Sequence, residues 1–247
     1  MRQINKLAGL VLAVSFLSAG TLPAQEGEGV WYRGLVAPSE VIEVSSQVPG
    51  IIDRVTVERG DRIAKGKVLA ELRAGVEKAQ VELAEARLEF GRRKVERNRE
   101  LYEKQLISIH EKDEMETEVR IRELQLKEAE ERLALRTIRS PVTGVVVERY
   151  LGSGEYVGDE GAIMKIARID PLNVELVVPA ERYRTIDQGM TVRIRPQDPL
   201  GGSYQGRVVI VDEVIDAASS TFGVRVRLPN PGHRIPAGIN CQVGFSE

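Results

Sequence analysis

Hydrophobic residues change their spacing twice along this chain. Over residues 30–72, and again from 138 to the end, Gly and Val are frequent and apolar residues alternate with polar ones. This alternation predicts short β-strands. Between these regions, residues 75–137 contain Glu, Arg, Lys, Leu and Ala, with no Pro and one internal glycine, Gly91. The pattern therefore predicts a helical block inserted into a β-rich protein.

Within the helical block, apolar residues recur at spacings of three, four and seven. One stripe comprises Val76, Ala79, Leu83, Ala86 and Phe90, and a second comprises Val81, Ala84, Leu88, Val95 and Tyr102. The returning segment repeats Val119, Leu126 and Leu133 at sevens, with Met115, Leu124 and Leu135 nearby. Such spacing places residues on one face of a helix that needs a partner. We expect an antiparallel coiled-coil hairpin over residues 74–137.

The reversal of this hairpin is predicted by one short motif. Ser108 followed by Glu111 forms a capping box, in which each side chain bonds the backbone of the other residue. One helix should end near Lys104 and the next should begin at Ser108. Two helices of about 30 residues, rising 1.5 Å per residue, make a rod of roughly 45 Å. Because a small β-domain cannot cover such a length, the rod should project.

The β-segments on either side of the rod form an internal repeat. The first reads VPGIIDRVTVERGDRIAKGKVLAEL (48–72) and the second reads PVTGVVVERYLGSGEYVGDEGAIMKIA (141–167). The matched pairs are Gly50 with Gly144, Gly60 with Gly154, Ile63 with Val157 and, after a slip of one residue, Gly66 with Gly161. Paired glycines between alternating apolar residues indicate strands joined by turns of positive φ. Two halves related by a pseudo-twofold would make one flattened barrel.

The N-terminus carries an export signal. Arg2 and Lys6 precede an apolar run over residues 7–19, and Ala24 follows at a plausible cleavage point. This arrangement predicts a signal peptide over residues 1–24, with a retained anchor as the alternative. The run is short for a membrane span, which needs about 20 apolar residues. The only cysteine is Cys241, so an exported protein with this sequence has no internal disulfide.

Composition and motifs argue against several classes of function. The formal net charge is −2, whereas broad nucleic-acid binding requires a basic surface. No phosphate-binding, nucleophile-elbow or dinucleotide motif occurs, and the two histidines, His110 and His233, have no ligand-like spacing. We expect no catalytic residue, cofactor or metal, and no nucleic-acid partner.

Taken in order, these features resemble the periplasmic adaptor, or membrane fusion protein, family. The resemblance covers about residues 30–247 and includes Asp216, the segment 221–226 and the turns at 229–232 and 236–238, which match the adaptor β-barrel signature. It implies an elongated α+β protein with a split lipoyl-like β-domain. The implied segments are an N-terminal strand (25–43), the two lipoyl halves (44–73 and 138–170), the inserted hairpin (74–137) and a β-barrel domain (171–247).

Such a protein would be a non-enzymatic subunit of a tripartite efflux or secretion system in the periplasm. It would link an inner-membrane transporter to a TolC-like outer-membrane channel and form a sealed conduit as a homo-oligomer, trimeric or hexameric. Transporters of the resistance–nodulation–division type are favoured over ATP-binding-cassette types. Adaptors of the former usually carry a further membrane-proximal domain, which we expect to be missing or vestigial here.

The hairpin tip carries the candidate site. Arg97, three residues, Leu101, six residues and Ser108 match the tip motif of adaptors that dock on TolC-like channels. Arg97 offers a planar fork for carboxylates or carbonyls, Leu101 an apolar knob and Ser108 a small polar surface. The alternative is purely structural, because Arg and Leu are common in helices and a serine N-cap needs no partner.

Two other functions are consistent with parts of the sequence. Met164-Lys165 is similar to the modified site of biotin carriers, which would make the chain a biotin or lipoyl-type carrier subunit. The modified lysine of such carriers occupies the turn between the two halves, however, and this chain has Leu72-Arg73-Ala74-Gly75 there. We therefore expect Lys165 to be an ordinary strand residue. A purely structural envelope tether is not separated from an adaptor by sequence.

Overall fold

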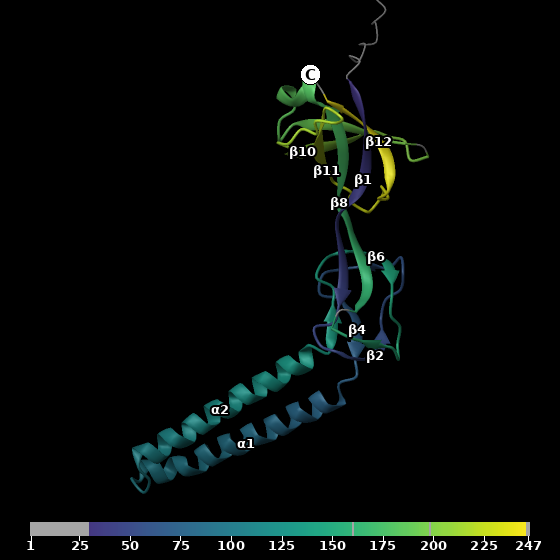
Figure 1. The fold of residues 1–247 in the computed structure, drawn as a ribbon. Helices are drawn as coiled ribbons and strands as arrows, with labels where there is room; N and C mark the ends of the chain where they lie inside the picture. The colour runs from purple at the N-terminus through teal and green to yellow at the C-terminus, as the bar shows by residue number, and fades with distance from the viewer. Residues whose placement is uncertain (1–29, 160, 198, 246–247) are drawn as a thin grey trace, which may run out of the picture.

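The computed structural model describes residues 30–159, 161–197 and 199–245. Figure 1 shows three parts that follow one another: a β-barrel at one end, a smaller β-domain in the middle and a helical hairpin at the other end. The signal peptide expected over residues 1–24 lies outside the described residues. None of the described helices combines the length and the apolar character needed to cross a membrane.

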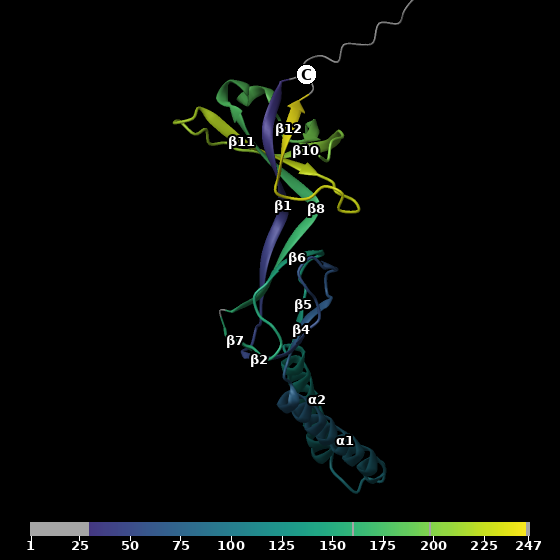
Figure 2. The same ribbon diagram turned by 90° about the vertical axis from the view of Figure 1, so that its right-hand side faces the viewer.

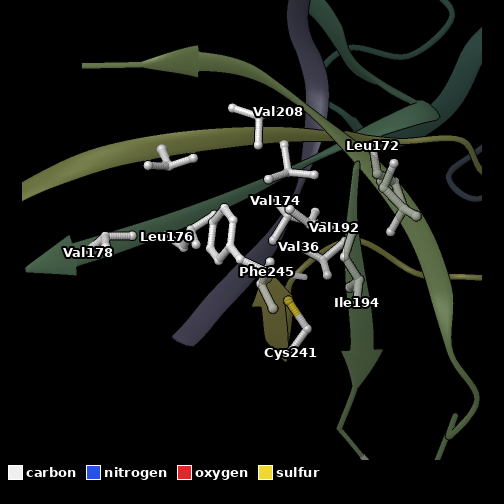
Figure 3. Close-up of a cluster of buried hydrophobic side chains, with 14 of the residues drawn as sticks. Val36, Leu172, Val174, Leu176, Val178, Val192, Ile194, Val208, Cys241 and Phe245 are labelled. Carbon is white, nitrogen blue, oxygen red and sulfur yellow. The ribbon is translucent and has the colours of Figure 1, made fainter. Parts of the chain in front are cut away.

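Six strands close the barrel in the order β1-β12-β9-β10-β11-β8, with β1 also paired to β8. Their bounds are β1 (Trp31–Ser45), β8 (Ala162–Pro179), β9 (Thr191–Pro196), β10 (Tyr204–Val211), β11 (Thr221–Leu228) and β12 (Ile239–Phe245), and the 3₁₀ helix η1 (Ala180–Thr185) follows β8. Buried residues alternate with more exposed ones along β9 and β11, as the sequence pattern predicts. Figure 3 shows the resulting core, to which β1 contributes Val36 and β12 contributes Cys241 and Phe245.

Two long strands join the barrel to the middle domain. β1 and β8 remain paired from Gly34↔Leu176 to Ser45↔Ala162, with a register shift between Pro38 and Glu40. At this junction the Asn230 side chain is buried and fastens the loop before β12 to β8. Its amide nitrogen donates to the carbonyls of Ile169 (2.9 Å) and Ile235 (2.8 Å), and its oxygen accepts from the Ile235 N–H (3.0 Å).

The middle domain is built from the two predicted half-motifs. Its short strands are β2 (Gly50–Val55), β3 (Arg62–Ile63), β4 (Val68–Leu72), β5 (Thr137–Arg139), β6 (Gly144–Arg149) and β7 (Tyr156–Val157). Gly50 pairs with Val157, and the equivalent Gly144 pairs with Ile63. The Gly60 N–H donates to the Val146 carbonyl and the Gly154 N–H to the Ile52 carbonyl, both at 2.8 Å. The two halves therefore interlock by reciprocal contacts.

Three turn glycines of the repeat have the predicted backbone conformation. Gly60, Gly154 and Gly66 have φ values of 94°, 89° and 85°, the left-handed region predicted for them. Gly161, matched to Gly66 across the slip in the repeat, follows a residue outside the described part of the chain, and its N–H donates to the Gly158 carbonyl (3.3 Å). Gly144 has a different role, because a Cβ at this position would collide with the Ala167 carbonyl.

Helices α1 (Gly75–Glu103) and α2 (Ile109–Ala134) form the projecting hairpin. Leu88 and Gly91 of α1 and Ala129 of α2 are buried between the helices. The second predicted stripe, from Val81 to Tyr102, faces α2, and its side chains are buried or partly buried. The first stripe is exposed: Val76 is 68% and Leu83 51% exposed. Of the α2 residues grouped with the stripe, Leu124 also points to solvent.

Candidate partner-docking site at the hairpin tip

The tip lies at the end of the molecule farthest from the barrel (Figures 1 and 2). Helix α1 ends at Glu103, and Gln105 adopts a left-handed conformation with φ 58°. The Gln105 N–H donates to the Tyr102 carbonyl and the Leu106 N–H to the Leu101 carbonyl, both at 2.8 Å. This is a Schellman motif, in which glycine is the usual left-handed residue. The tip is thus ordered without a helix breaker.

Helix α2 starts with the capping box that the sequence predicts. The Ser108 hydroxyl accepts the Glu111 N–H at 3.1 Å, and the Glu111 carboxylate accepts the Ser108 N–H at 2.8 Å. The Ser108 N–H first, and second the Ser108 hydroxyl, which donates to the same carboxylate (3.1 Å), hold the pKa of Glu111 below its ordinary value. Both helix ends at the tip are therefore satisfied locally, and the side chains around them do not depend on a partner to fold.

The three predicted site residues are exposed at this end of the hairpin. Arg97 and Leu101 lie one turn apart on α1, and Ser108 caps α2 across the reversal. The sequence motif did not include two neighbours, Leu106 and Ile109, which are 68% and 57% exposed. The sequence could have indicated them, because both are apolar residues at the reversal that belong to no predicted helical stripe. With Leu101 they make an apolar tip surface.

Arg97 differs from the other cations in the last turns of α1. Five neighbouring basic residues form ion pairs: Arg92 with Glu123, Arg93 with Glu89, Lys94 with Glu118, Arg99 with Glu103 and Lys104 with Glu100. Within the described part of the chain, Arg97 forms none. Its guanidinium group is therefore available for carboxylates or carbonyl oxygens of another molecule.

Other candidate residues occupy structural positions. Lys165 lies inside β8, with its ammonium 3.5 Å from the Glu43 carboxylate, as expected for a strand lysine. Burial raises the pKa of the Cys241 thiol to about 11. His110 is exposed, and His233 is partly buried with φ 56°. Among the described residues no cluster of His, Cys, Asp or Glu is suited to a metal ion.

Two family models match the chain. Residues 40–168 match the CzcB-like barrel-sandwich hybrid domain, and residues 172–247 match the CusB-like β-barrel domain. The chain is 24% identical over 233 residues to the multidrug/solvent efflux pump periplasmic linker protein MepA of Pseudomonas putida, covering 84% of this chain and 61% of the relative. It is 25% identical over 233 residues to the cobalt-zinc-cadmium resistance protein CzcB of Cupriavidus metallidurans, covering 87% and 44%.

The chain thus spans between about two fifths and three fifths of these relatives. Among solved structures, a MacA–MexA chimera containing the Pseudomonas aeruginosa MexA α-hairpin domain has a TM-score of 0.74 at 19% identity, covering 88% of this chain and 80% of the chimera. The membrane fusion protein Spr0693 of Streptococcus pneumoniae has a TM-score of 0.70 at 14% identity, covering 88% and 99%. Both share the fold. Since the family models match most of the described residues, this chain belongs to the membrane fusion protein family of periplasmic adaptors.

Proposed function

We propose that this chain is the periplasmic adaptor of a tripartite efflux or secretion system and that its hairpin tip docks on a TolC-like outer-membrane channel. The observation that carries the proposal is the tip itself. Its one cation without an ion pair in the described chain, Arg97, lies beside an exposed apolar surface at the far end of a projecting arm. A contiguous apolar surface left exposed on a folded protein is typical of a site that a partner covers.

The barrel end of the molecule would face the inner-membrane transporter. The relatives named as efflux pump periplasmic linkers support a role in efflux, and the match of residues 172–247 to the CusB-like β-barrel model favours a pump of the resistance–nodulation–division type. No residue of the described chain suggests catalysis, and an adaptor needs none. Its task is mechanical, because it holds two membrane proteins at a fixed separation.

Several copies would pack side by side to seal the conduit, as a trimer or a hexamer. The first stripe of α1 supports this arrangement, because Val76, Leu83 and Phe90 recur every seven residues and remain 51–68% exposed. A stripe of that length would favour non-specific association if it stayed in water. A neighbouring hairpin is the partner whose length and repeat match it.

The decisive variant combines Arg97→Glu with Leu101→Ser in the full chain. We expect export in cells to be lost while the circular dichroism spectrum and thermal midpoint of the purified protein stay close to those of the wild type. Both side chains are exposed, and surface substitutions of this kind change stability by about 0.5 kcal/mol or less. Arg132→Glu is the matched control, because this exposed arginine lies at the base of the hairpin. Full export by the double variant would refute docking through the tip.

Ser108 needs a separate comparison because it also caps α2. Ser108→Ala removes the cap, whereas Ser108→Asp keeps one, since Asp is an equally good N-cap residue. If Ser108 contacts the channel through its small neutral surface, both variants reduce export. Recovery of export with Asp would instead assign Ser108 a capping role alone and leave docking to Arg97 and Leu101.

The alternatives are a biotin or lipoyl-type carrier and a structural envelope tether. The position of Lys165 inside β8 disfavours the carrier, because a swinging arm is attached at a turn. Intact mass measurement of the mature protein tests it directly, since an adduct on Lys165 would support the carrier. A tether would copurify with neither a transporter nor a channel, and affinity purification from membranes therefore separates it from an adaptor.

A further inference from the structure

The barrel has two opposite walls of contrasting character. On one side, the β10–β11 loop (212–220) leaves beside the end of β8, where Thr221 pairs with Pro179 and the Ala180 N–H donates to the Ser220 carbonyl (2.9 Å). On the other side lies β9, three strands away from β8 in a six-stranded barrel. The two surfaces therefore face away from each other; the loop can be followed next to β11 in Figure 2.

The loop is acidic, and its apolar residues point to solvent. Val214 is 81% exposed and Ile215 41%, and the loop also contains Asp212, Glu213 and Asp216. Leaving an aliphatic side chain in water forgoes the free energy of its burial, so an exposed pair of this kind marks a contact surface when it is held in place.

The loop is indeed held in place. The Asp216 carboxylate accepts the N–H groups of Ala218 (2.8 Å) and Ser219 (3.1 Å), and the Asp216 N–H donates to the Thr221 carbonyl (2.8 Å). The hydroxyls of Ser219 and Thr221 lie 2.7 Å apart. Asp216 is used in this turn, and the Asp212 carboxylate lies against Gly223, where an added Cβ would meet it, so Glu213 is the carboxylate left to act outward. Such preorganisation lowers the entropy lost when a partner binds.

The opposite wall is basic. The outer faces of β1, β9 and β10 present Arg33, Arg193, Arg195 and Arg207, and the barrel strands β9, β10 and β12 contain no Asp or Glu, nor does β1 from Trp31 to Pro38. Register places Arg33 beside Gln242 of β12, and Gln242 beside Arg195. The wall is thus a basic patch whose charge is complementary to that of the acidic loop.

An aromatic platform lies within this basic wall. The Trp31 ring extends over Gly244 of β12, where an added Cβ would come within 3.0 Å of the indole. The Arg195 guanidinium stacks on the ring, with its carbon 4.2 Å from the centroid. Leu35 of β1 is 46% exposed on the same outer face. These groups supply apolar surface for aliphatic side chains between the arginines.

We infer that the β10–β11 loop of one copy docks on the β1–β12–β9 wall of a second copy of this chain. Val214 and Ile215 would cover the Trp31–Leu35 surface, and Glu213 would meet Arg33 beside it. Because the two surfaces differ and face opposite ways, the contact is head-to-tail and closes into a ring when the rotation permits. The inference rests on the proposed function only in requiring that several copies assemble.

Disulfide cross-linking tests the contact and its direction, since the native Cys241 is buried. We expect Val214→Cys alone and Arg33→Cys alone to give no linked dimer under oxidation. The chain carrying both substitutions should give a ladder of linked species that ends at the ring. The control pairs Val214→Cys with Val41→Cys, an exposed site on the part of β1 in the middle domain, and should give no ladder. Dimers from Val214→Cys alone, or linkage only to another protein, would overturn the inference.

A charge exchange tests the same contact without cysteine. Glu213→Arg and Arg33→Glu should each weaken self-association at least tenfold in sedimentation, and the combined variant should recover most of the loss. Absence of recovery would contradict the pairing. The Arg97→Glu/Leu101→Ser substitutions lie outside the barrel, so a chain that also carries the cysteine pair should still give the ladder. Loss of export with an intact ladder would therefore be an effect of the tip alone. Export without any ladder would refute the ring contact and leave tip docking standing.

Discussion

At the scale of single residues, local hydrogen bonds explain the tip. The chain reverses with Gln105 in a conformation that usually requires glycine, since a left-handed residue with a Cβ costs roughly 1–2 kcal/mol. The Schellman bonds from Gln105 and Leu106 offset this cost. The capping box at Ser108 was readable from sequence because both partners lie within four residues. The left-handed conformation of Gln105 could not be predicted from the sequence, because a glutamine side chain does not favour positive φ.

The capping box makes hairpin stability depend on pH. The folded state lowers the pKa of Glu111 through its bonds to Ser108. Its contribution to stability is therefore present above the ordinary carboxyl pKa of about 4.3 and is lost as the pH falls through the lowered folded value. We expect Glu111→Gln to reduce the thermal midpoint of the helical signal at neutral pH and to change it much less at pH 2. An equal loss at both pH values would contradict a charge-dependent cap.

At the scale of elements, the hairpin is held to the middle domain by one arginine. Arg136 follows α2 and donates to the Pro49 carbonyl (3.0 Å) and to the Glu77 carboxylate in the first turn of α1 (2.6 Å). The Arg136 and Glu77 side chains are only 22% and 15% exposed. Gly50 makes room for this contact, because a Cβ there would lie 2.8 Å from the guanidinium. This contact connects the start of α1 to the end of α2 at the base of the hairpin, where the chain enters and leaves the middle domain.

We expect Arg136→Met to break this contact. Hydrogen bonds to charged groups contribute about 1.5–3 kcal/mol, and a double-mutant cycle with Glu77→Gln should show a coupling of that order. Distances between spin labels on the hairpin and the middle domain should broaden in Arg136→Met while the helical signal is retained. Arg139→Met is the control, because Arg139 donates to the Gly66 carbonyl (3.1 Å) within the middle domain. A distance distribution as narrow as that of the wild type would show that the two connecting chains alone orient the arm.

At the scale of the whole molecule, two separate hydrophobic cores lie along the same two long strands. The barrel core contains Phe222 and the middle core contains Leu69, both at most 2% exposed, and the two clusters share no residue. β1 and β8 supply residues to both. The cores are therefore connected covalently and by backbone pairing, but each packs by itself.

This organisation predicts separable unfolding. Phe222→Ala should cost about 3–5 kcal/mol and Leu69→Ala about 2–5 kcal/mol. The only tryptophan, Trp31, lies in the barrel, so its fluorescence follows barrel unfolding. In urea we expect Phe222→Ala to lower the fluorescence midpoint and Leu69→Ala to leave it nearly unchanged. Equal shifts from both variants would show that the shared strands unfold the two cores as one unit.

The sequence by itself determined the features that depend on neighbouring residues: the helix boundaries, the capping box, the glycine turns and the repeat of the two half-motifs. Their cause is local geometry, which a few adjacent side chains specify. Only the tertiary structure decided which apolar stripe of α1 meets α2, that Arg136 reaches Glu77 and Pro49, and that Arg97 has no ion pair in the described chain. These depend on groups brought together from distant positions, where packing selects one pairing among many that the pattern allows.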